Sequence, residues 1–558
     1  MKKNCYASAR HICIAWLFIA STLSVFSQGF SPNTVARLQH VLDSFQNNPA
    51  NPYIGGMSAA IKVDGLASWQ GATGYAARNV DAGNNLLPGG TPFITATLSR
   101  IYSITKTFTA ALTLQLAQEG ALSLNDPVSK FLPLNLINPK LNPTVTIRQL
   151  LAHESGYSDF LEAQDLQIAV AFQPTHVWTP FESISFATQE AQPGMVRHYS
   201  STNYIVLGAI IEAATGKQVA QLFRERFFDP LHLNSMYLAG REPAGNRGVL
   251  AVPHDNISAL NPIFQFTGQP TFPDTITNIS RFPFTAIESI AFTSGGIVSN
   301  VGDVARWGND LFSGRATSQT ILDQMLHSIS STPDEDGDYL GYGIWRSTRI
   351  SATDVFIGHD GNATGYRSVM FYQPERKMTI AILTNFHGAK LYEVAKALYA
   401  ALPDFICGNE HRDEAKIQLC WNGKSLCVAR AAAGGFIEKG AYLGSCEEGK
   451  KNDKTTNLNT FPVRKTDVVE IESNNIYAYP NPFKSSVDLS FRADQSGKAI
   501  LRLYDGSGKL VTTLFNDTIQ KGTVQKIVFQ AGNLPSGIYF TQLQTAQGMS
   551  RQKVVLQR

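Results

Sequence analysis

The sequence predicts an α+β protein: an antiparallel sheet flanked by helices, with a helical lobe inserted between its strands, followed by a C-terminal β-sandwich. Three observations support this prediction. Strand-like segments lie near both ends of residues 28–403, and the stretch between them is mostly helical. Apolar residues make up 43% of the chain, which is enough for a large core. From residue 476 onward, short alternating strands are separated by glycines.

The first half of the main domain begins with strands and continues with helices. Residues 56–77 alternate apolar and polar side chains with glycine breaks, which is typical of antiparallel strands. Helices are expected at residues 35–45, from about Ser103 to residue 117, at residues 146–153 and at residues 203–214.

The second half is expected to close the same sheet. Residues 240–284 are rich in Pro, Asn and Thr and predict a long loop over the site. Residues 293–296 predict a turn before a helix that starts near Val301. Three strands are expected at residues 353–358, 368–372 and 378–384, and a last helix at residues 389–401.

Residues 1–27 predict a secretory signal peptide. Lys2, Lys3 and Arg10 form its charged region, residues 12–26 form its apolar region, and cleavage is expected after Ser27. The alternative is an N-terminal membrane anchor, but the apolar run is short for a span of about 20 residues. No later stretch is long and apolar enough to cross a bilayer, so no transmembrane span is expected.

Four cysteines define a small module at residues 404–446. An even, local set of cysteines in an exported chain predicts two disulfides. Zinc is the alternative, but the spacing lacks paired C-x-x-C motifs and His411 is the one nearby histidine. Residues 447–475 are charged and polar and predict a linker. The cysteines concerned are Cys407, Cys420, Cys427 and Cys446.

The charge distribution argues against a general nucleic-acid or membrane-surface binder. The net charge is +3, and the three positive charges of the leader account for all of it. Residues 474–558 carry ten Lys and Arg and four Asp, a net charge of +6, so the rest of the exported chain is −6. No nucleic-acid partner is therefore expected.

The first chemical motif is Ser103 followed by Lys106 at the start of a predicted helix. Positions i and i+3 share one face of a helix, so the hydroxyl and the amine would lie side by side. A serine hydroxyl needs a base to become a nucleophile, and a desolvated lysine can serve. The motif alone is weak, because on the order of two S-x-x-K matches are expected by chance in such a chain.

Two further segments strengthen this motif. Tyr199 lies in the run R-H-Y-S-S-T-N-Y before a predicted helix, and His359 and Gly361 lie in G-H-D-G-N at a predicted strand end. Penicillin-binding enzymes carry S-x-x-K together with two later motifs. The order found here is similar to the sister set S-x-x-K, Y-x-N and H-x-G, except that Ser201 stands in the place of Asn.

With these motifs, residues 57–402 resemble the class C β-lactamase-related serine hydrolases, which include D-alanyl-D-alanine carboxypeptidases and esterases. Residues 122–127, 153–156 and 294–296 extend the match. The resemblance implies a β-lactamase/transpeptidase-like fold. It also implies roles for the site residues: Ser103 is the acylated nucleophile, Lys106 its partner, Tyr199 the general base, His359 and Gly361 line the strand edge beside the substrate, and Asn362 joins Ser103 in an oxyanion hole.

Some of these residues could instead have purely structural roles. Tyr199 could be a core tyrosine and His359 a loop histidine with satisfied hydrogen bonds, and His153 near a helix end favours a structural role. Ser201 is shorter than the Asn it replaces and could reach Lys106 only if its loop lies closer. No H-E-x-x-H or similar ligand spacing occurs, so no catalytic metal and no cofactor are expected.

The C-terminal segment carries a second resemblance. Residues 479–483 (Y-P-N-P-F), 534–539 (L-P-S-G-I-Y) and the basic end 553–558 are similar to a type IX secretion C-terminal sorting domain. This implies the secretion machinery as a partner and a secreted or cell-surface location. The alternative is an ordinary carbohydrate-binding or adhesion sandwich.

The sequence thus predicts an exported, metal-free serine hydrolase with an appended sorting domain. Its acyl-enzyme would form on Ser103, and its substrates would be small amides or esters: D-amino-acid peptides, esters or β-lactams. The alternative is a non-turnover penicillin-binding sensor or surface adhesin with a degenerate site, which Ser201 favours.

Overall fold

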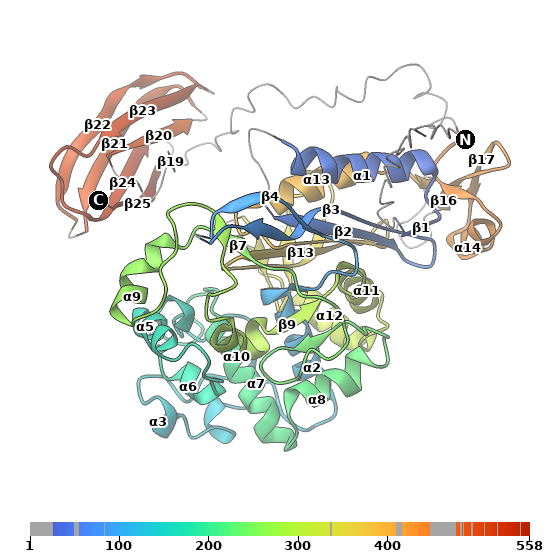
Figure 1. Ribbon diagram of the computed structural model, residues 1–558, viewed down its shortest axis with the longest axis horizontal. Helices are drawn as coiled ribbons and strands as arrows, with labels where there is room; N and C mark the ends of the chain where they lie inside the picture. The colour runs from blue at the N-terminus through green and yellow to red at the C-terminus, as the bar shows by residue number, and fades with distance from the viewer. Residues whose placement is uncertain are drawn as a thin grey trace, which may run out of the picture. The chain divides into compact units, whose positions relative to one another are not determined.

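The computed structural model describes residues 26–48, 55–82, 84–334, 337–408, 416–446, 476–479, 483, 485–492, 495–506, 508–521, 523–546 and 548–557 (Figure 1). The chain divides into two compact units, Met1–Asn452 and Asp453–Arg558. Residues 1–25 of the predicted leader and the predicted linker 447–475 lie outside the described residues. In the described ranges, no helix has the length and hydropathy to cross a membrane.

One antiparallel sheet organises the first unit. Among the described residues it has nine strands in the order β1-β3-β2-β14-β13-β12-β11-β10, with β4 paired to β3. Strands from both ends of the unit meet at its centre, where Ile61 of β2 pairs with Ile380 of β14. The strands are β1 (Phe26–Gln28), β2 (Gly56–Val63), β3 (Ala67–Val80), β4 (Leu86–Pro92), β10 (Tyr339–Leu340), β11 (Trp345–Ser347), β12 (Phe356–Ala363), β13 (Tyr366–Gln373) and β14 (Met378–Thr384).

Helices cover both faces of this sheet because its central strands are apolar on both sides. Ile380 and Ile382 belong to the core formed with α1 (Pro32–Gln46) and α13 (Leu391–Ala401), which lie along one face (Figure 1). The alternate residues Ala381 and Leu383 belong to the core on the other face. That core includes α11 (Val301–Phe312) and the helical lobe.

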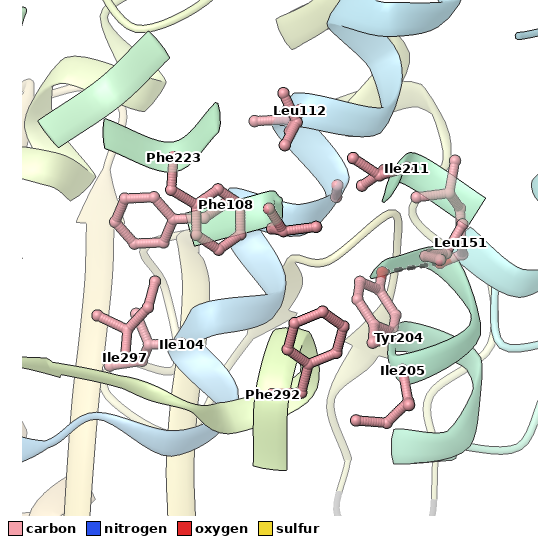
Figure 2. Close-up of a cluster of buried hydrophobic side chains, with 14 of the residues drawn as sticks. Ile104, Phe108, Leu112, Leu151, Tyr204, Ile205, Ile211, Phe223, Phe292 and Ile297 are labelled. Carbon is pink, nitrogen blue, oxygen red and sulfur yellow. Dashed lines mark hydrogen bonds between the residues drawn. The ribbon is translucent and has the colours of Figure 1, made fainter. Parts of the chain in front are cut away.

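The lobe is built around α2 (Thr105–Gln118), which follows a 3-10 turn, η1 (Tyr102–Ile104). Most of α2 is buried, as expected for a helix that is apolar around its circumference. Figure 2 shows Phe108 and Leu112 of α2 in a cluster with Phe223, Ile211 and Tyr204. The lobe also contains α3 (Leu134–Ile137), α4 (Ile147–Leu151), α5 (Gln164–Phe172), α6 (Pro180–Ile184), α7 (Ser201–Thr215), α8 (Val219–Phe223), α10 (Phe284–Gly295) and α12 (Gln319–His327).

Local signals fix the start of α4 and the end of α7. Thr146 and Gln149 form a reciprocal capping box at the start of α4. Gly216 ends α7 in the left-handed region, at φ 68°. The predicted α+β fold, with its sheet, flanking helices and inserted lobe, is confirmed.

Three local predictions were wrong. Residues 240–284 are not simply a loop: they hold β7 (His254–Asp255), α9 (Asn261–Phe266) and β8 (Thr277–Asn278) around their own apolar cluster, which includes Phe264 and Phe272. The turn expected at residues 293–296 is the end of α10. The strand expected to end at residue 358 continues to Ala363, because its turn comes only at Gly365, where φ is 79°.

The four cysteines form the two predicted disulfides, Cys407–Cys427 and Cys420–Cys446. Their segment contains β15 (Ile406–Cys407), β16 (Lys416–Trp421), β17 (Lys424–Val428), α14 (Arg430–Glu438) and β18 (Tyr442–Leu443). Its buried Ile417, Leu419 and Ile437 join the core beneath α1 and α13. The segment therefore packs on the face of the sheet opposite the helical lobe.

The second unit consists of two antiparallel sheets around one core, as the predicted sandwich requires. One sheet has the order β19-β20-β23 and the other β22-β21-β24-β25. Not every strand shows the expected alternation: β22 carries many polar, exposed residues. The strands are β19 (Ile476–Tyr479), β20 (Ser486–Arg492), β21 (Gly497–Asp505), β22 (Leu510–Ile519), β23 (Val524–Gln530), β24 (Gly537–Thr545) and β25 (Gly548–Leu556).

Candidate active site

Ser103 and Lys106 lie together at the entry to the most buried helix of the lobe. Ser103 is in η1 and Lys106 is in the first turn of α2. The Lys106 amine donates to Ser103 Oγ at 2.9 Å and to the carbonyl oxygen of Ser294 at 2.9 Å. One helical turn therefore brings the two side chains together, as the S-x-x-K spacing predicts.

The environment of Lys106 favours its neutral form. Its side chain is fully buried, and this desolvation lowers its pKa to about 7. The carboxylates of Asp159 and Asp360 act in the opposite direction and raise the pKa. An amine with this pKa is partly unprotonated at neutral pH, so Lys106 can accept a proton from Ser103.

Tyr199 completes a three-residue cluster with Ser103 and Lys106. Its hydroxyl is hydrogen-bonded to Ser103, and the Lys106 amine lies 4.8 Å from the centre of its ring. Desolvation raises the pKa of Tyr199 well above its ordinary value, although the bond to Ser103 lowers it. Tyr199 is therefore a neutral phenol near pH 7, suited to relay a proton rather than to act as a phenolate.

His153 holds the Tyr199 segment in place. Its ring stacks on Tyr199 with 4.6 Å between ring centres, and its Nδ1 accepts the backbone N–H of Ser200 at 3.1 Å. Burial lowers its pKa well below the ordinary value, so the ring is neutral. These contacts fit the structural role that the sequence favours for His153.

Ser201 is the first residue of α7 and is buried. Its N–H donates to Asp159 Oδ2 at 2.9 Å, so Asp159 satisfies one of the free donors at this helix start. In the described part of the chain, the hydrogen bonds of Lys106 go to Ser103 and Ser294 and none goes to Ser201. Sequence reasoning missed Asp159, because a single acid in a loop carries no motif.

His359 lies on the other side of the cluster, on β12, and is fully buried. Its Nδ1 donates to the backbone carbonyl of Asp360 at 2.6 Å, which leaves Nε2 as the unprotonated nitrogen. Nε2 is buried and has no partner among the described residues. Burial and the nearby Lys106 lower the pKa of His359 to about 3, so this ring is neutral.

Trp345 was also missed from the sequence. Its ring lies 4.2 Å from the His359 ring and 5.7 Å from that of Tyr199, centre to centre. It therefore closes the cluster on the β11 side. A lone tryptophan in a three-residue strand gives no sequence signal for such a position.

Gly361 allows β12 to approach the nucleophile. A Cβ atom at this position would collide with the carbonyl oxygen of Ile101 and with Ser368 Oγ. Ile101 lies two residues before Ser103, so the close approach sets the distance between the strand and the serine. This contact supports the role that the H-x-G motif implies for Gly361.

Beyond Gly358, β12 has no β11 partner in the described part of the chain. β11 pairs with β12 only as far as Trp345 and Gly358 in the described register. Residues 359–363 therefore present backbone groups that a substrate could pair with. Asn362 is exposed on this stretch, and its N–H stays the candidate partner of the Ser103 N–H in an oxyanion hole.

Asp360 points to the opposite face of β12. Its carboxylate accepts the Tyr392 hydroxyl at 3.3 Å, and Arg349 stacks on the Tyr392 ring at 3.5 Å. Desolvation raises the pKa of Asp360 to about 6, although Arg349 lowers it. Among the described residues, no group of three His, Cys, Asp or Glu side chains could hold a metal ion.

An antiparallel sheet, an S-x-x-K pair at the start of a buried helix and an H-x-G stretch on β12 define the class of proteins with the β-lactamase/transpeptidase-like fold. The Beta-lactamase family model matches residues 43–403, and the chain belongs to this family. The model named secretion system C-terminal sorting domain matches residues 477–557. Both resemblances predicted from the sequence are confirmed, and the second domain indicates export by a secretion system.

Curated proteins similar to this chain include Protein flp and a D-aminopeptidase. Protein flp of Staphylococcus aureus (strain N315) is 26% identical over 289 residues, 51% of this chain and 52% of that protein. D-aminopeptidase of Cereibacter sphaeroides (strain KD131) is 25% identical over 370 residues, 65% of this chain and 62% of that protein. The chain thus spans about half the length of the first of these curated relatives.

Solved structures give the same fold. The D-amino acid amidase from Ochrobactrum anthropi SV3, complexed with L-phenylalanine amide, has a TM-score of 0.53 and 25% identity, covering 66% of this chain and 98% of that one. A D-stereospecific amidohydrolase from Streptomyces sp. has a TM-score of 0.52 and 24% identity, covering 66% and 99%. The second likeness concerns the fold alone.

Proposed function

We propose that this protein is an exported serine hydrolase that forms an acyl-enzyme on Ser103 and transfers the acyl group of small amides or esters to water. The observation that carries the proposal is the 2.9 Å contact between Ser103 and a buried lysine whose pKa is lowered to about 7. This combination of a hydroxyl and a neutral amine is what nucleophilic catalysis needs.

The proposed reaction begins with neutral Lys106. As Ser103 Oγ forms a bond to the substrate carbonyl carbon, its proton passes to Lys106. The resulting oxyanion is held by the N–H groups of Ser103 and Asn362, a type of contact worth about 10²–10³ in rate. The proton then moves through the Tyr199 phenol to the leaving amine or alkoxide, and the carbonyl re-forms as the acyl-enzyme.

Deacylation repeats these steps with water as the nucleophile. Water adds to the acyl carbon and its proton passes to neutral Lys106, with Tyr199 as the relay. The bond between the acyl carbon and Ser103 Oγ then breaks, Ser103 Oγ takes this proton back, and the acid product is released. Tyr199 is the general base that the resemblance implies, but its raised pKa makes Lys106 the better resting acceptor. The relatives named D-aminopeptidase and D-amino acid amidase support amide substrates over β-lactams.

The competing candidate is a binding protein whose acyl-enzyme does not turn over. Ser201 favours it, because this residue stands where the family pattern has Asn and makes no hydrogen bond to Lys106 in the described chain. Turnover of p-nitrophenyl acetate separates the two: continuous release of nitrophenol supports the hydrolase, and a single stoichiometric burst supports the binder.

Labelling identifies the reacting residue. We expect a fluorophosphonate to add one adduct to the tryptic peptide that contains Ser103, and Ser103→Ala to remove both labelling and turnover. Ser155 and Ser294 are the internal controls, because both are buried beside the site. An adduct on either of them with Ser103 unmodified would falsify the proposed mechanism.

A further inference from the structure

Asp159 is a carboxylate that contacts the segment after Tyr199 and that the proposed reaction does not use. It comes just before the 3-10 turn η3 (Phe160–Glu162) and is half-buried. Its Oδ2 accepts the N–H of Ser201 and its Oδ1 accepts the N–H of Leu161 at 3.1 Å. Among the described residues, Asp159 forms no ion pair with a lysine, arginine or histidine.

The position of Asp159 is fixed against the catalytic cluster. Its contact residue Ser201 is two residues after Tyr199, and its charge acts on both Lys106 and Tyr199. A carboxylate accepts at about four lone-pair positions, and the two backbone donors leave the remainder open. The carboxylate can therefore accept a hydrogen bond from a further charged partner without breaking either backbone contact.

The other charged groups around the site do not favour an anionic ligand. His359 is neutral, and its free nitrogen is an acceptor. The Arg197 guanidinium is occupied by Glu154 and by the carbonyls of Ser328 and Leu340. The Lys106 amine donates its hydrogen bonds to Ser103 and Ser294. A substrate carboxylate would therefore be repelled by Asp159, and none of these groups would offer it a compensating positive charge.

We propose that Asp159 binds the ammonium group of the substrate. The enzyme then selects amides or esters of amino acids with a free amino group over substrates that carry a carboxylate near the reacting carbonyl, such as β-lactams. The proposal rests on the proposed acyl transfer at Ser103. A charge-assisted hydrogen bond between ammonium and carboxylate is shorter and stronger than a neutral one, so it also fixes the position of the reacting carbonyl.

The test compares two substrates that differ only in the charge at nitrogen: D-alanine 4-nitroanilide and its N-acetyl derivative. The wild-type protein is expected to favour the free amine. In Asp159→Asn, kcat/KM for the free amine should fall about 10-fold or more, the scale of a hydrogen bond to a charged group. For the N-acetyl derivative, kcat/KM should change by less than about threefold, since this substrate has no ammonium group that could bind to Asp159.

Controls separate this role from folding. Asp159→Ser keeps an oxygen that can cap the start of α7, and it should give the same selective loss. Glu162→Gln removes an exposed charge three residues away and should leave both substrates unchanged. Protection of Ser103 from an uncharged fluorophosphonate by the two anilides reports their binding even where the anilide bond is cleaved slowly.

The outcomes are distinct. No adduct on wild-type Ser103 would overturn the acyl-transfer mechanism itself. An adduct on Ser103, with no preference for the amine in the wild type or with equal losses for both anilides in Asp159→Asn, would overturn only the role of Asp159. A loss confined to the free amine in both Asp159 variants, with normal fluorophosphonate labelling, supports it.

Discussion

At the scale of residues, the proposed acyl transfer depends on the protonation states of the side chains around Ser103. Burial favours the neutral forms of Lys106, Tyr199, His153 and His359, because it shifts the pKa of the amine and the imidazoles down and that of the phenol up. With a pKa of about 7, Lys106 is the member of this cluster that changes its protonation near neutral pH. The carboxylates that act on this cluster are Asp159 and Asp360.

This arrangement predicts how labelling depends on pH. The protonated amine cannot accept the proton of Ser103, so the rate of fluorophosphonate labelling should rise with pH and level off above the Lys106 pKa of about 7. Below that value the rate should fall about tenfold per pH unit. Asp159→Asn removes a charge that raises this pKa, so the midpoint should move to lower pH.

Two results would contradict this assignment. A midpoint near 10, the ordinary value for lysine, would show that Lys106 stays protonated through the physiological range. A midpoint near 6 that disappears in Asp360→Asn would instead belong to that carboxyl, whose pKa is raised to about 6.

At the scale of elements, two segments distant in sequence set the geometry of the nucleophile. The turn η1 is fixed through Tyr102, whose backbone lies at φ 43° and whose hydroxyl donates to the carbonyl of Thr364 at 3.0 Å. β12 reaches the same turn because Gly361 has no side chain. These contacts therefore couple the position of η1 to that of β12.

Gly361→Ala tests this contact. The added methyl group must displace Ile101 or Ser368, so we expect a loss of about 1–3 kcal/mol in the free energy of unfolding, the usual cost of overpacking. A shift of about 1 Å in the turn should also slow Ser103 labelling by about 100-fold.

The matched control for this variant is Gly435→Ala. This glycine lies in α14, where an added Cβ meets no neighbouring atom. Alanine is the better helix former, so stability should be unchanged or higher. If Gly361→Ala labels at the wild-type rate while the protein remains folded, β12 does not position the serine.

At the scale of the whole molecule, the candidate active site and the two disulfides of the first unit lie on opposite faces of its sheet. The site lies between the helical lobe and β12, whereas the two disulfides belong to a segment that packs beneath α1 and α13 on the other face. The sheet lies between them. The second unit has a core of its own.

Reduction should therefore affect stability rather than catalysis. Removal of both disulfides should lower the free energy of unfolding by about 2–5 kcal/mol, measured by denaturant titration with and without reductant. Ser103 labelling at 25 °C should remain within about twofold of the oxidised protein, since no cross-link touches the site. A large loss of labelling in protein that is still folded would show that this segment supports the site.

The features that the sequence predicted correctly are mostly local. The spacing of Ser103 and Lys106 follows from one helical turn, and the short apolar run at residues 378–384 identifies a central strand. Each of these depends on neighbours within a few positions. Family membership could likewise be inferred because its motifs are short and ordered.

Other features were decided only by the tertiary structure. Asp159, Trp345 and the carbonyl of Ser294 reach the cluster from separate segments, and no local pattern marks them. The lowered pKa of Lys106 results from burial, which is a property of everything packed around it. The small core within residues 240–284 likewise forms only when distant aromatic residues meet, so a composition typical of loops concealed it. The sequence determined that Ser103 and Lys106 lie side by side; long-range packing decided the charge state of this pair and its neighbours.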